Sequence, residues 1–404
     1  MSPPSPRPLW AGRTLALAGI VLVAFNLRTA VASLSPILGH LEAEMPLTPA
    51  VVGFLGMLPP LCYAVFGVMT PAVAKRLGLE PTLVVALLAL SAGLVGRGLA
   101  GSAFWLVAAS AVTFAAIGVG NVLLPPLVKR YFPDRIGLVT TIYVTAMSFS
   151  TFAPPLIAVP VAETAGWRVS LGEWALIAAI SLVPWIAMLV HPRAAPAEAL
   201  PEQADPGLLR HALRSPLAWS LMIVFAVSGF NAYAAFAWLP AILHDVAGVA
   251  PAEAGALLGL YAAMGLPAGL IVPLIASRFG KVRLLVAIAV AVLATGYLGL
   301  LLVPGSATSL WVALIGTGQL LFPLTLVLIN LRTRTHAGSV ALSGFVQSGG
   351  YLIVAIGPLV VGLLHEWTDG WTLPILVLLA SAVPAAIAGR VVARPRYLED
   401  DRAP

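Results

Sequence analysis

Residues 14–41 read TLALAGIVLVAFNLRTAVASLSPILGHL, a stretch long enough to cross a bilayer that contains one charged residue, Arg28. If the span ended at Arg28, each piece of about 14 residues would fall short of the roughly 20 that a transmembrane helix needs. The helix is therefore predicted to continue through the arginine. A guanidinium keeps its proton in proteins, so this side chain must face protein or water. An ionisable group at membrane depth marks a functional site, and a fixed cation predicts an anionic or strongly dipolar cargo.

The composition of the whole chain is that of a membrane protein. Of its 404 residues, 60% are hydrophobic and 9% are charged, whereas a soluble domain is about 25% charged. The single cysteine, Cys62, lies inside an apolar run, so there is neither a disulfide framework nor a metal-binding spacing. Barrel strands would be about 10 residues long with strict alternation, so the long apolar runs predict an all-α membrane protein.

Apolar runs of spanning length occur twelve times and predict twelve transmembrane helices. They lie at 14–41, 49–74, 81–100, 103–128, 137–161, 170–190, 215–243, 252–277, 283–303, 308–331, 338–364 and 371–392.

The basic residues predict how these helices are oriented. Of the 22 lysines and arginines, all except Arg28, Arg97 and Arg168 fall in the two terminal tails or in every second loop. Cytoplasmic loops carry such an excess of positive charge, so we expect a multi-pass protein of the cytoplasmic (inner) membrane with both termini in the cytoplasm. The net charge of +6 then belongs to short loops beside membrane lipid. It does not indicate a nucleic-acid partner.

The longest polar stretch, 191–213, is rich in proline, alanine and glutamate and reads as a cytoplasmic linker. It divides the chain into an N-terminal six-helix bundle at 1–190 and a C-terminal six-helix bundle at 214–404. The two halves repeat in sequence. The second predicted span and the loop after it recur 202 positions later, where Pro49, Gly53, Gly67, Pro71, Arg76 and Gly78 match Pro251, Gly255, Gly269, Pro273, Arg278 and Gly280.

Three further matches follow in the same order along the chain. Phe25-Asn26 in the first span aligns with Phe230-Asn231 in the seventh, and the fourth and tenth spans share a Gly-x-Gly motif. The segments that end the fifth and eleventh spans both start with Pro-Leu and end with Gly-Trp. Corresponding spans in the same order mean parallel halves related by an axis along the membrane normal. The fold class predicted is thus an all-α membrane protein of two pseudo-symmetric bundles, the major facilitator arrangement.

Two motifs carry a narrower resemblance. FNLRTAVASLSPIL at 25–38 and NVLLPPLVKRYFPDR at 121–135 resemble the cyanate/2-nitroimidazole permease family of the major facilitator superfamily. That resemblance implies transport of small anions or small dipolar heteroaromatic compounds, and it does not fix the cargo. It also implies a central cavity lined mainly by the first, fourth, seventh and tenth spans.

Polar side chains at mid-depth in the cavity-lining and neighbouring spans are the candidate substrate-binding residues. They are Asn26, Arg28, Asn121, Tyr143, Asn231, Tyr233, Trp238, Tyr261, Gln319, Gln347 and Tyr351. Each has a structural alternative. Arg28 could bind backbone carbonyls, the asparagines and glutamines could join helices, and the aromatic residues could simply pack. No Asp or Glu is predicted at mid-span, so Arg28 has no obvious permanent partner.

The superfamily resemblance also implies gating residues in the loops after the second and eighth spans. The candidates are Arg76 and Gly78 with their repeats Arg278 and Gly280. The first loop departs from the superfamily pattern, because Pro71 replaces its first glycine and Lys75 occupies the position of an acidic residue. The latch that the acidic residue normally provides is therefore in doubt.

Together these features predict a secondary active transporter for a small anion or polar heteroaromatic (cyanate- or nitroimidazole-like) compound. It would work by rocker-switch alternating access as a monomer, with Arg28 as the counter-charge. The alternative is a multidrug efflux pump for neutral compounds, which usually carries a mid-span carboxylate. No clustered catalytic groups, cofactor motif, metal site or nucleotide-binding loop is evident, so neither an enzyme nor a cofactor is predicted.

Overall fold

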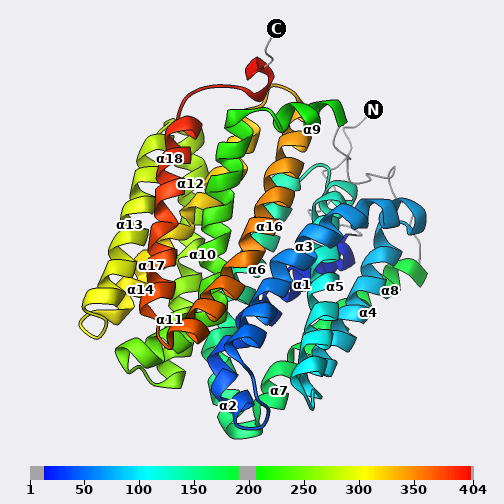
Figure 1. Ribbon diagram of the computed structural model, residues 1–404. Helices are drawn as coiled ribbons and strands as arrows, with labels where there is room; N and C mark the ends of the chain where they lie inside the picture. The colour runs from blue at the N-terminus through cyan, green and yellow to red at the C-terminus, as the bar shows by residue number, and fades with distance from the viewer. Residues whose placement is uncertain (1–12, 191–205, 402–404) are drawn as a thin grey trace, which may run out of the picture.

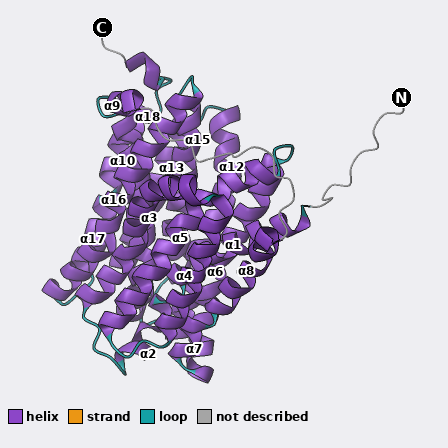
Figure 2. Ribbon diagram, turned by 90° about the vertical axis from the view of Figure 1, so that its right-hand side faces the viewer, coloured by secondary structure: helices purple, strands orange, loops and turns teal. Residues whose placement is uncertain are grey.

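The computed structural model describes residues 13–190 and 206–401, and its regular elements are helices (Figures 1 and 2). Within these residues, twelve helical segments are long and apolar enough to cross a membrane. Each predicted span agrees with one of them to within four residues at both ends. Hydropathy alone therefore located the spans correctly, because backbone groups in lipid must bond within their own helix.

The first six spans form one bundle, and the second and fifth of these spans also pack extensively against the second bundle. Its elements are α1 (Thr14–Ala32), η1 (Ser35–Ile37), α2 (Leu38–Glu42), α3 (Pro49–Leu77), α4 (Leu79–Gly98), α5 (Ala103–Tyr131), α6 (Ile136–Ala165), α7 (Trp167–Gly172) and α8 (Trp174–Val190).

The second bundle follows a short helix, α9 (Pro206–Ala212), that lies on the last part of the predicted linker. Its elements are α10 (Pro216–Ala247), α11 (Pro251–Ala263), α12 (Gly265–Arg278), α13 (Val282–Leu302), α14 (Thr308–Thr317), η2 (Gly318–Leu320), α15 (Leu321–Leu331), α16 (His336–Thr368), α17 (Thr372–Ala380), α18 (Ala382–Val392) and η3 (Leu398–Asp401). Residues 191–205 of the predicted linker lie outside the described residues, so its exact limits remain a prediction.

Several helices begin where the sequence supplies a cap. The side chains of Thr48, Ser102, Ser215 and Thr335 each accept a hydrogen bond from the backbone N–H three residues later. Such N-caps satisfy donors that have no partner within the first helical turn. The long helices α3, α5 and α6 continue through their paired prolines, so those prolines do not end the helices.

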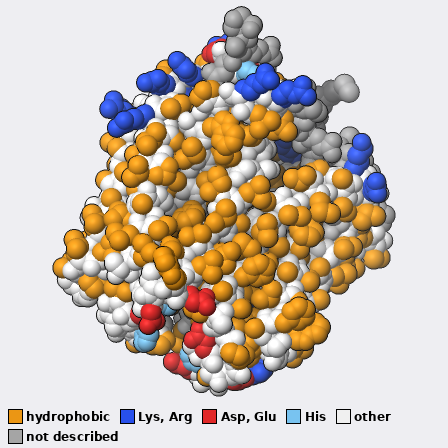
Figure 3. All heavy atoms as spheres, viewed as in Figure 1, with side chains coloured by type: hydrophobic (Ala, Val, Ile, Leu, Met, Phe, Trp, Pro, Cys, Tyr) orange, Lys and Arg blue, Asp and Glu red, His pale blue; other side chains and the backbone are white. Residues whose placement is uncertain are grey.

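The two ends of the molecule differ in charge. We call the end that carries the chain's C-terminal segment the basic end, because Lys and Arg gather there, and the opposite end, around α2, the acidic end (Figure 3). The last turns of α3, α5, α12 and α18 contribute basic residues to the basic end. Arg7, Arg193 and Arg402 lie outside the described residues.

The two bundles meet through glycines in the half of the membrane nearer the acidic end. A Cβ atom added to Gly53 of α3 would lie 2.9 Å from the carbonyl oxygen of Pro358 on α16, and one added to Gly255 of α11 would lie 2.6 Å from the carbonyl oxygen of Pro155 on α6. Only glycine allows backbones to approach this closely. We call these contacts the glycine seam.

The same helices do not meet at their other ends. Gly67 of α3 and Gly269 of α12 are the repeats of one another, and a Cβ atom added to either would meet nothing within 4 Å. In Figure 1, α3 and α16 diverge toward the basic end. The repeated glycines thus divide into a packed set at the acidic end and an unpacked set toward the basic end, so the bundles are joined at the acidic end.

A C-terminal strap, residues 393–401, ties the second bundle together at the basic end. Leu398 is fully buried, and its carbonyl oxygen lies 2.8 Å from Nε2 of His211 on α9. The Oε1 atom of Glu399 accepts hydrogen bonds from the backbone N–H groups of Arg334 and Thr335 and from the Thr335 hydroxyl. The strap therefore supports the N-terminus of α16, the helix that forms half of the seam.

We predict that Glu399→Ala destabilises the protein by about 1 kcal/mol, as loss of a helix cap does. Burial would raise the pKa of the Glu399 carboxyl, but its hydrogen bonds, mainly from backbone N–H groups, hold that pKa below its ordinary value. The contribution is thus present above the unfolded pKa of about 4.3 and is lost as the pH falls through the lower folded value. Thermal unfolding in detergent at neutral and acidic pH measures this. Asp400→Ala, which removes an exposed ion pair with Arg334, should cost less; an equal cost would contradict the prediction.

A second prediction concerns the seam. Gly255→Ala should lower the thermal stability of this conformation by about 1–3 kcal/mol because a backbone oxygen occupies the space. The matched control is Gly269→Ala, which gains the same helix propensity of up to about 1 kcal/mol without a clash. Equal melting temperatures for the two variants would show that the seam is loosely packed.

Candidate functional site

Arg28 lies near the middle of the membrane on α1 and is half-buried. Its Nη1 atom donates a hydrogen bond of 3.1 Å to the carbonyl oxygen of the neighbouring Leu27. Among the residues that the structure describes, no carboxylate lies within ion-pair distance of its guanidinium. The cation therefore retains hydrogen-bond donors and charge for a ligand.

Three tyrosines surround this arginine. The guanidinium carbon lies 5.8 Å from the ring centroid of Tyr63, within cation–π range, and the charge of Arg28 also interacts with Tyr233 and Tyr351. The Tyr63 ring makes edge contacts with both, at centroid distances of 6.5 Å and 6.0 Å. The Tyr63 hydroxyl is buried and interacts with the side chains of Arg28 and Tyr233. We call Arg28 and these tyrosines the Arg28 cluster.

The cluster draws on both bundles. Arg28 and Tyr63 come from α1 and α3, and Tyr233 and Tyr351 come from α10 and α16. An aromatic row continues into the second bundle, where Phe225 packs edge-on against Tyr351 with the centroids 5.1 Å apart. The geometry of the cluster therefore depends on how the two bundles are placed relative to one another.

The repeat explains why Arg28 and Tyr233 meet. Aligning Asn26 with Asn231 puts Arg28 of the first half opposite Tyr233 of the second. Equivalent positions close to the pseudo-symmetry axis are neighbours in space. The cluster therefore forms at a position where one half of the repeat carries a charge and the other half does not.

Tyr63 was not among the sequence candidates, although Tyr233 and Tyr351 were. It sits at the midpoint of the 29-residue helix α3, so the criterion of a polar side chain at mid-depth applied to it as well. What the sequence could not supply was the direction of its ring, which depends on how α3 packs across the bundle interface.

Asn26 and Asn231 lie in helix–helix contacts. Nδ2 of Asn26 donates to the Ser181 hydroxyl on α8 at 2.9 Å, and Nδ2 of Asn231 donates to the Ser381 hydroxyl at 2.8 Å. Asn231 also accepts from the Tyr297 hydroxyl. Both side chains are at most 3% exposed. These matched contacts join the first span to the sixth and the seventh to the twelfth, and they favour the helix-joining alternative over substrate contact.

The other predicted amides also have partners. Nε2 of Gln319 donates to the Tyr261 carbonyl at 2.8 Å, close to the point where α11 gives way to α12. Nδ2 of Asn121 donates a hydrogen bond to the carbonyl oxygen of Ile117, and Nε2 of Gln347 donates one to the hydroxyl of Ser343. All three amides are half-buried, so each keeps some surface that a ligand could reach.

The remaining aromatic candidates lie apart from the Arg28 cluster. Tyr261 is fully buried and packs edge-on against Phe236. Nε1 of Trp238 donates to the Pro358 carbonyl at the glycine seam. Tyr143 is half-buried in the half of α6 nearer the basic end. Substrate contact by these three side chains remains a prediction.

The predicted gating glycines end their helices. Gly78 and Gly280 have φ angles of +93° and +60°, a region that disfavours side chains. Arg76 and Arg278 are exposed at the basic end. Backbone geometry thus accounts for the two glycines, and a gating role for the four residues remains a prediction.

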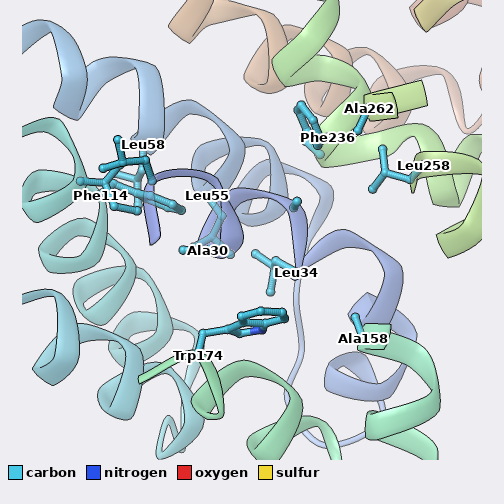
Figure 4. Close-up of a cluster of buried hydrophobic side chains, with 14 of the residues drawn as sticks. Ala30, Leu34, Leu55, Leu58, Phe114, Ala158, Trp174, Phe236, Leu258 and Ala262 are labelled. Carbon is cyan, nitrogen blue, oxygen red and sulfur yellow. The ribbon is translucent and has the colours of Figure 1, made fainter. Parts of the chain in front are cut away.

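A small cavity of about 20 Å³ lies beside the cluster toward the acidic end. It is lined by Ala30, Leu34 and Phe114 of the first bundle and by Tyr233 and Phe236 of the second. Figure 4 shows several of these side chains converging from the two bundles. Its volume suits about one water molecule, so the passage beyond Arg28 is nearly closed here.

Residues 20–343 match the profile of the Major Facilitator Superfamily. The chain belongs to this superfamily. The superfamily match runs from the first span into the start of the eleventh and so includes parts of both bundles.

Two relatives within the superfamily have names that state a substrate. The chain is 32% identical to a 2-nitroimidazole transporter of Escherichia coli (strain K12) over 391 residues, which cover 96% of this chain and 97% of the relative. It is 24% identical to a cyanate transport protein of the same organism over 349 residues, which cover 86% and 89%. The family resemblance inferred from the two sequence motifs is therefore confirmed.

The fold is also similar to a solved superfamily structure. A bacterial homologue of the human lysosomal transporter Spinster, crystallised in an inward-facing and occupied conformation, aligns with a TM-score of 0.75. The alignment covers 98% of this chain and 99% of that one at 15% identity. At this identity the likeness concerns the fold alone.

We predict that Asn231→Leu destabilises this superfamily member by about 1–3 kcal/mol, because the Tyr297 hydroxyl loses its buried partner. Asn26→Leu should cost less, since no tyrosine depends on Asn26 and the Ser181 hydroxyl also donates to Ile177. Thermal unfolding in detergent compares the two. Tyr297→Phe should cost nothing further in the Asn231→Leu background, and an additive cost would argue against the pairing.

Proposed function

We propose that this protein is a secondary active transporter for a small anion or a small, strongly dipolar heteroaromatic compound. The observation that carries the proposal is Arg28, a half-buried intramembrane cation that has no carboxylate partner in the described residues. A fixed charge in this position needs a compensating ligand, and the three tyrosines beside it offer hydroxyl groups and ring faces. The relatives' names, a 2-nitroimidazole transporter and a cyanate transport protein, support the same class of cargo.

The charge distribution supports an orientation with the basic end in the cytoplasm. Both termini then lie on the cytoplasmic side of the inner membrane. The glycine seam closes the outer side, and the unpacked glycines Gly67 and Gly269 lie toward the cytoplasm. In this orientation the conformation is inward-facing, and rocking of one bundle against the other would open the seam. We propose that the monomer is the transporting unit, because the cluster and both bundles come from one chain.

Energetics limit how an anion could move. Carrying one negative charge into a cell against a membrane potential costs about 2.3 kcal/mol per 100 mV. Arg28 keeps its proton, so it cannot relay one. Uptake of an anion would therefore need exchange for another anion or a proton carried by the substrate, whereas export of an anion follows the field.

Ligand-induced thermal stabilisation tests the proposal. Purified wild type and Arg28→Ala would be heated with cyanate, nitrate, bicarbonate, short carboxylates and nitroimidazoles in turn. A ligand at 100 times its Kd stabilises a protein by about 2.7 kcal/mol. We expect an anion or a nitroimidazole to stabilise the wild type and to have no effect on folded Arg28→Ala.

The matched control is Arg283→Ala, which removes an exposed arginine at the basic end and should leave the stabilisation unchanged. If neutral compounds stabilise wild type and Arg28→Ala equally, the arginine is structural, and the efflux-pump alternative replaces the proposal.

A further inference from the structure

A second arginine lies inside the first bundle and takes no part in the Arg28 cluster. Arg97, in the last turn of α4, has an exposed fraction of 0%. The sequence placed it near a helix end but did not predict its burial. Its Nη1 atom donates a hydrogen bond of 3.0 Å to the carbonyl oxygen of Ala30 on α1. Its Nε and Nη2 atoms find no acceptor among residues 13–190 and 206–401.

Burying Arg97 in this way costs free energy in the conformation observed. No carboxylate of the described chain pairs with Arg97, and its guanidinium carbon lies 5.8 Å from the ring centroid of Phe114. A buried charge without a partner costs several kcal/mol, which one hydrogen bond to a carbonyl and one ring contact do not offset. A purely structural role would be filled better by an apolar side chain of similar size.

The position of Arg97 suggests which part of the molecule could supply a partner for its buried charge. Its two contacts, Ala30 and Phe114, both line the small cavity, and so does Tyr233 of the Arg28 cluster. Ala30 follows Arg28 by two residues on α1, which is about 3 Å along the helix axis toward the acidic end. The cavity therefore shares Tyr233 with the Arg28 cluster and shares Ala30 and Phe114 with the surroundings of Arg97.

The cavity also lies at the bundle interface. Leu34 and Phe114 of the first bundle face Phe236 of the second across it, so it must widen when the glycine seam opens. Buried hydroxyls nearby, Ser33 and Ser35, also lack partners in the described part of the chain, and Ser35 lines the cavity itself. Polar groups that are unpartnered in the closed state are available when the seam opens.

We propose that Arg97 is a second anion-binding residue, which serves the half of the pathway on the acidic side. When the seam opens, Phe114 moves aside, and Arg97 exchanges the anion with Arg28 at one end and with the outer solution at the other. The inference rests on the proposed function, since its ligand is the same small anion. The two arginines, Arg28 on α1 and Arg97 on α4 beside Ala30, thus form successive positive positions.

Thiol labelling tests the exposure of Arg97 without reference to any cargo. Arg97→Cys and, as the matched control, Leu34→Cys would each be made in a Cys62→Ala background. Intact cells and inside-out vesicles would be treated with a membrane-impermeant methanethiosulfonate. In intact cells the reagent reaches the acidic end, and we expect both cysteines to be labelled there. Labelling of Leu34→Cys alone, or of neither, would overturn the proposal, because Arg97 then stays buried throughout the cycle.

Transport of labelled cyanate by reconstituted protein tests the charge. Arg97→Met removes the charge but keeps an apolar side chain, so we expect it to fold at least as stably as the wild type. Its rate of cyanate exchange should fall at least about tenfold. A wild-type rate would overturn the proposal. If Arg28→Ala also binds and transports cyanate normally, the proposed function fails instead, and labelling still decides whether Arg97 becomes exposed.

Discussion

A polar group inside a bilayer finds no water, so each must be satisfied by the protein or by what the protein binds. The matched asparagine–serine contacts at Asn26 and Asn231 meet this constraint between helices. Gln319 meets it at the break between α11 and α12. Arg28 and Arg97 are the two cations that meet it only in part within the described chain. Other buried polar atoms, such as Oδ1 of Asn26, also lack a partner in the described chain, so the two arginines differ from them by their charge.

Much of the fold could be predicted from the sequence because its signals are local or periodic. Span length follows from bilayer thickness, and the repeat of Gly53 at Gly255 follows from the need for close backbone approach in both halves. Orientation of side chains about the helix axis is different, because it depends on which helices are neighbours. Asn26 and Tyr63 illustrate this. The first was a candidate either for substrate contact or for joining helices, and it contacts α8; the second was overlooked but contacts Arg28.

The duplicated halves also show how a symmetric scaffold acquires an asymmetric site. The asparagines kept equivalent contacts, so the scaffold retained its internal symmetry. The neighbouring positions diverged to Arg28 and Tyr233, which meet close to the axis. One cation beside one phenol gives the centre a polarity that two identical residues could not. The sequence contained this difference, but its meaning depends on the two positions being adjacent in space.

The glycine seam bears on the energy gap between the two states of the transporter. Its surfaces are backbone atoms and small side chains such as Ala237 and Pro358, which lose almost no rotamer freedom on contact. Closing the seam therefore orders few side chains, and opening it releases little conformational entropy. Two states of similar free energy can be interconverted by the modest differential affinity of a small ligand. If the proposed function holds, a contact of this kind would allow a small cargo to change the conformation of a 404-residue protein.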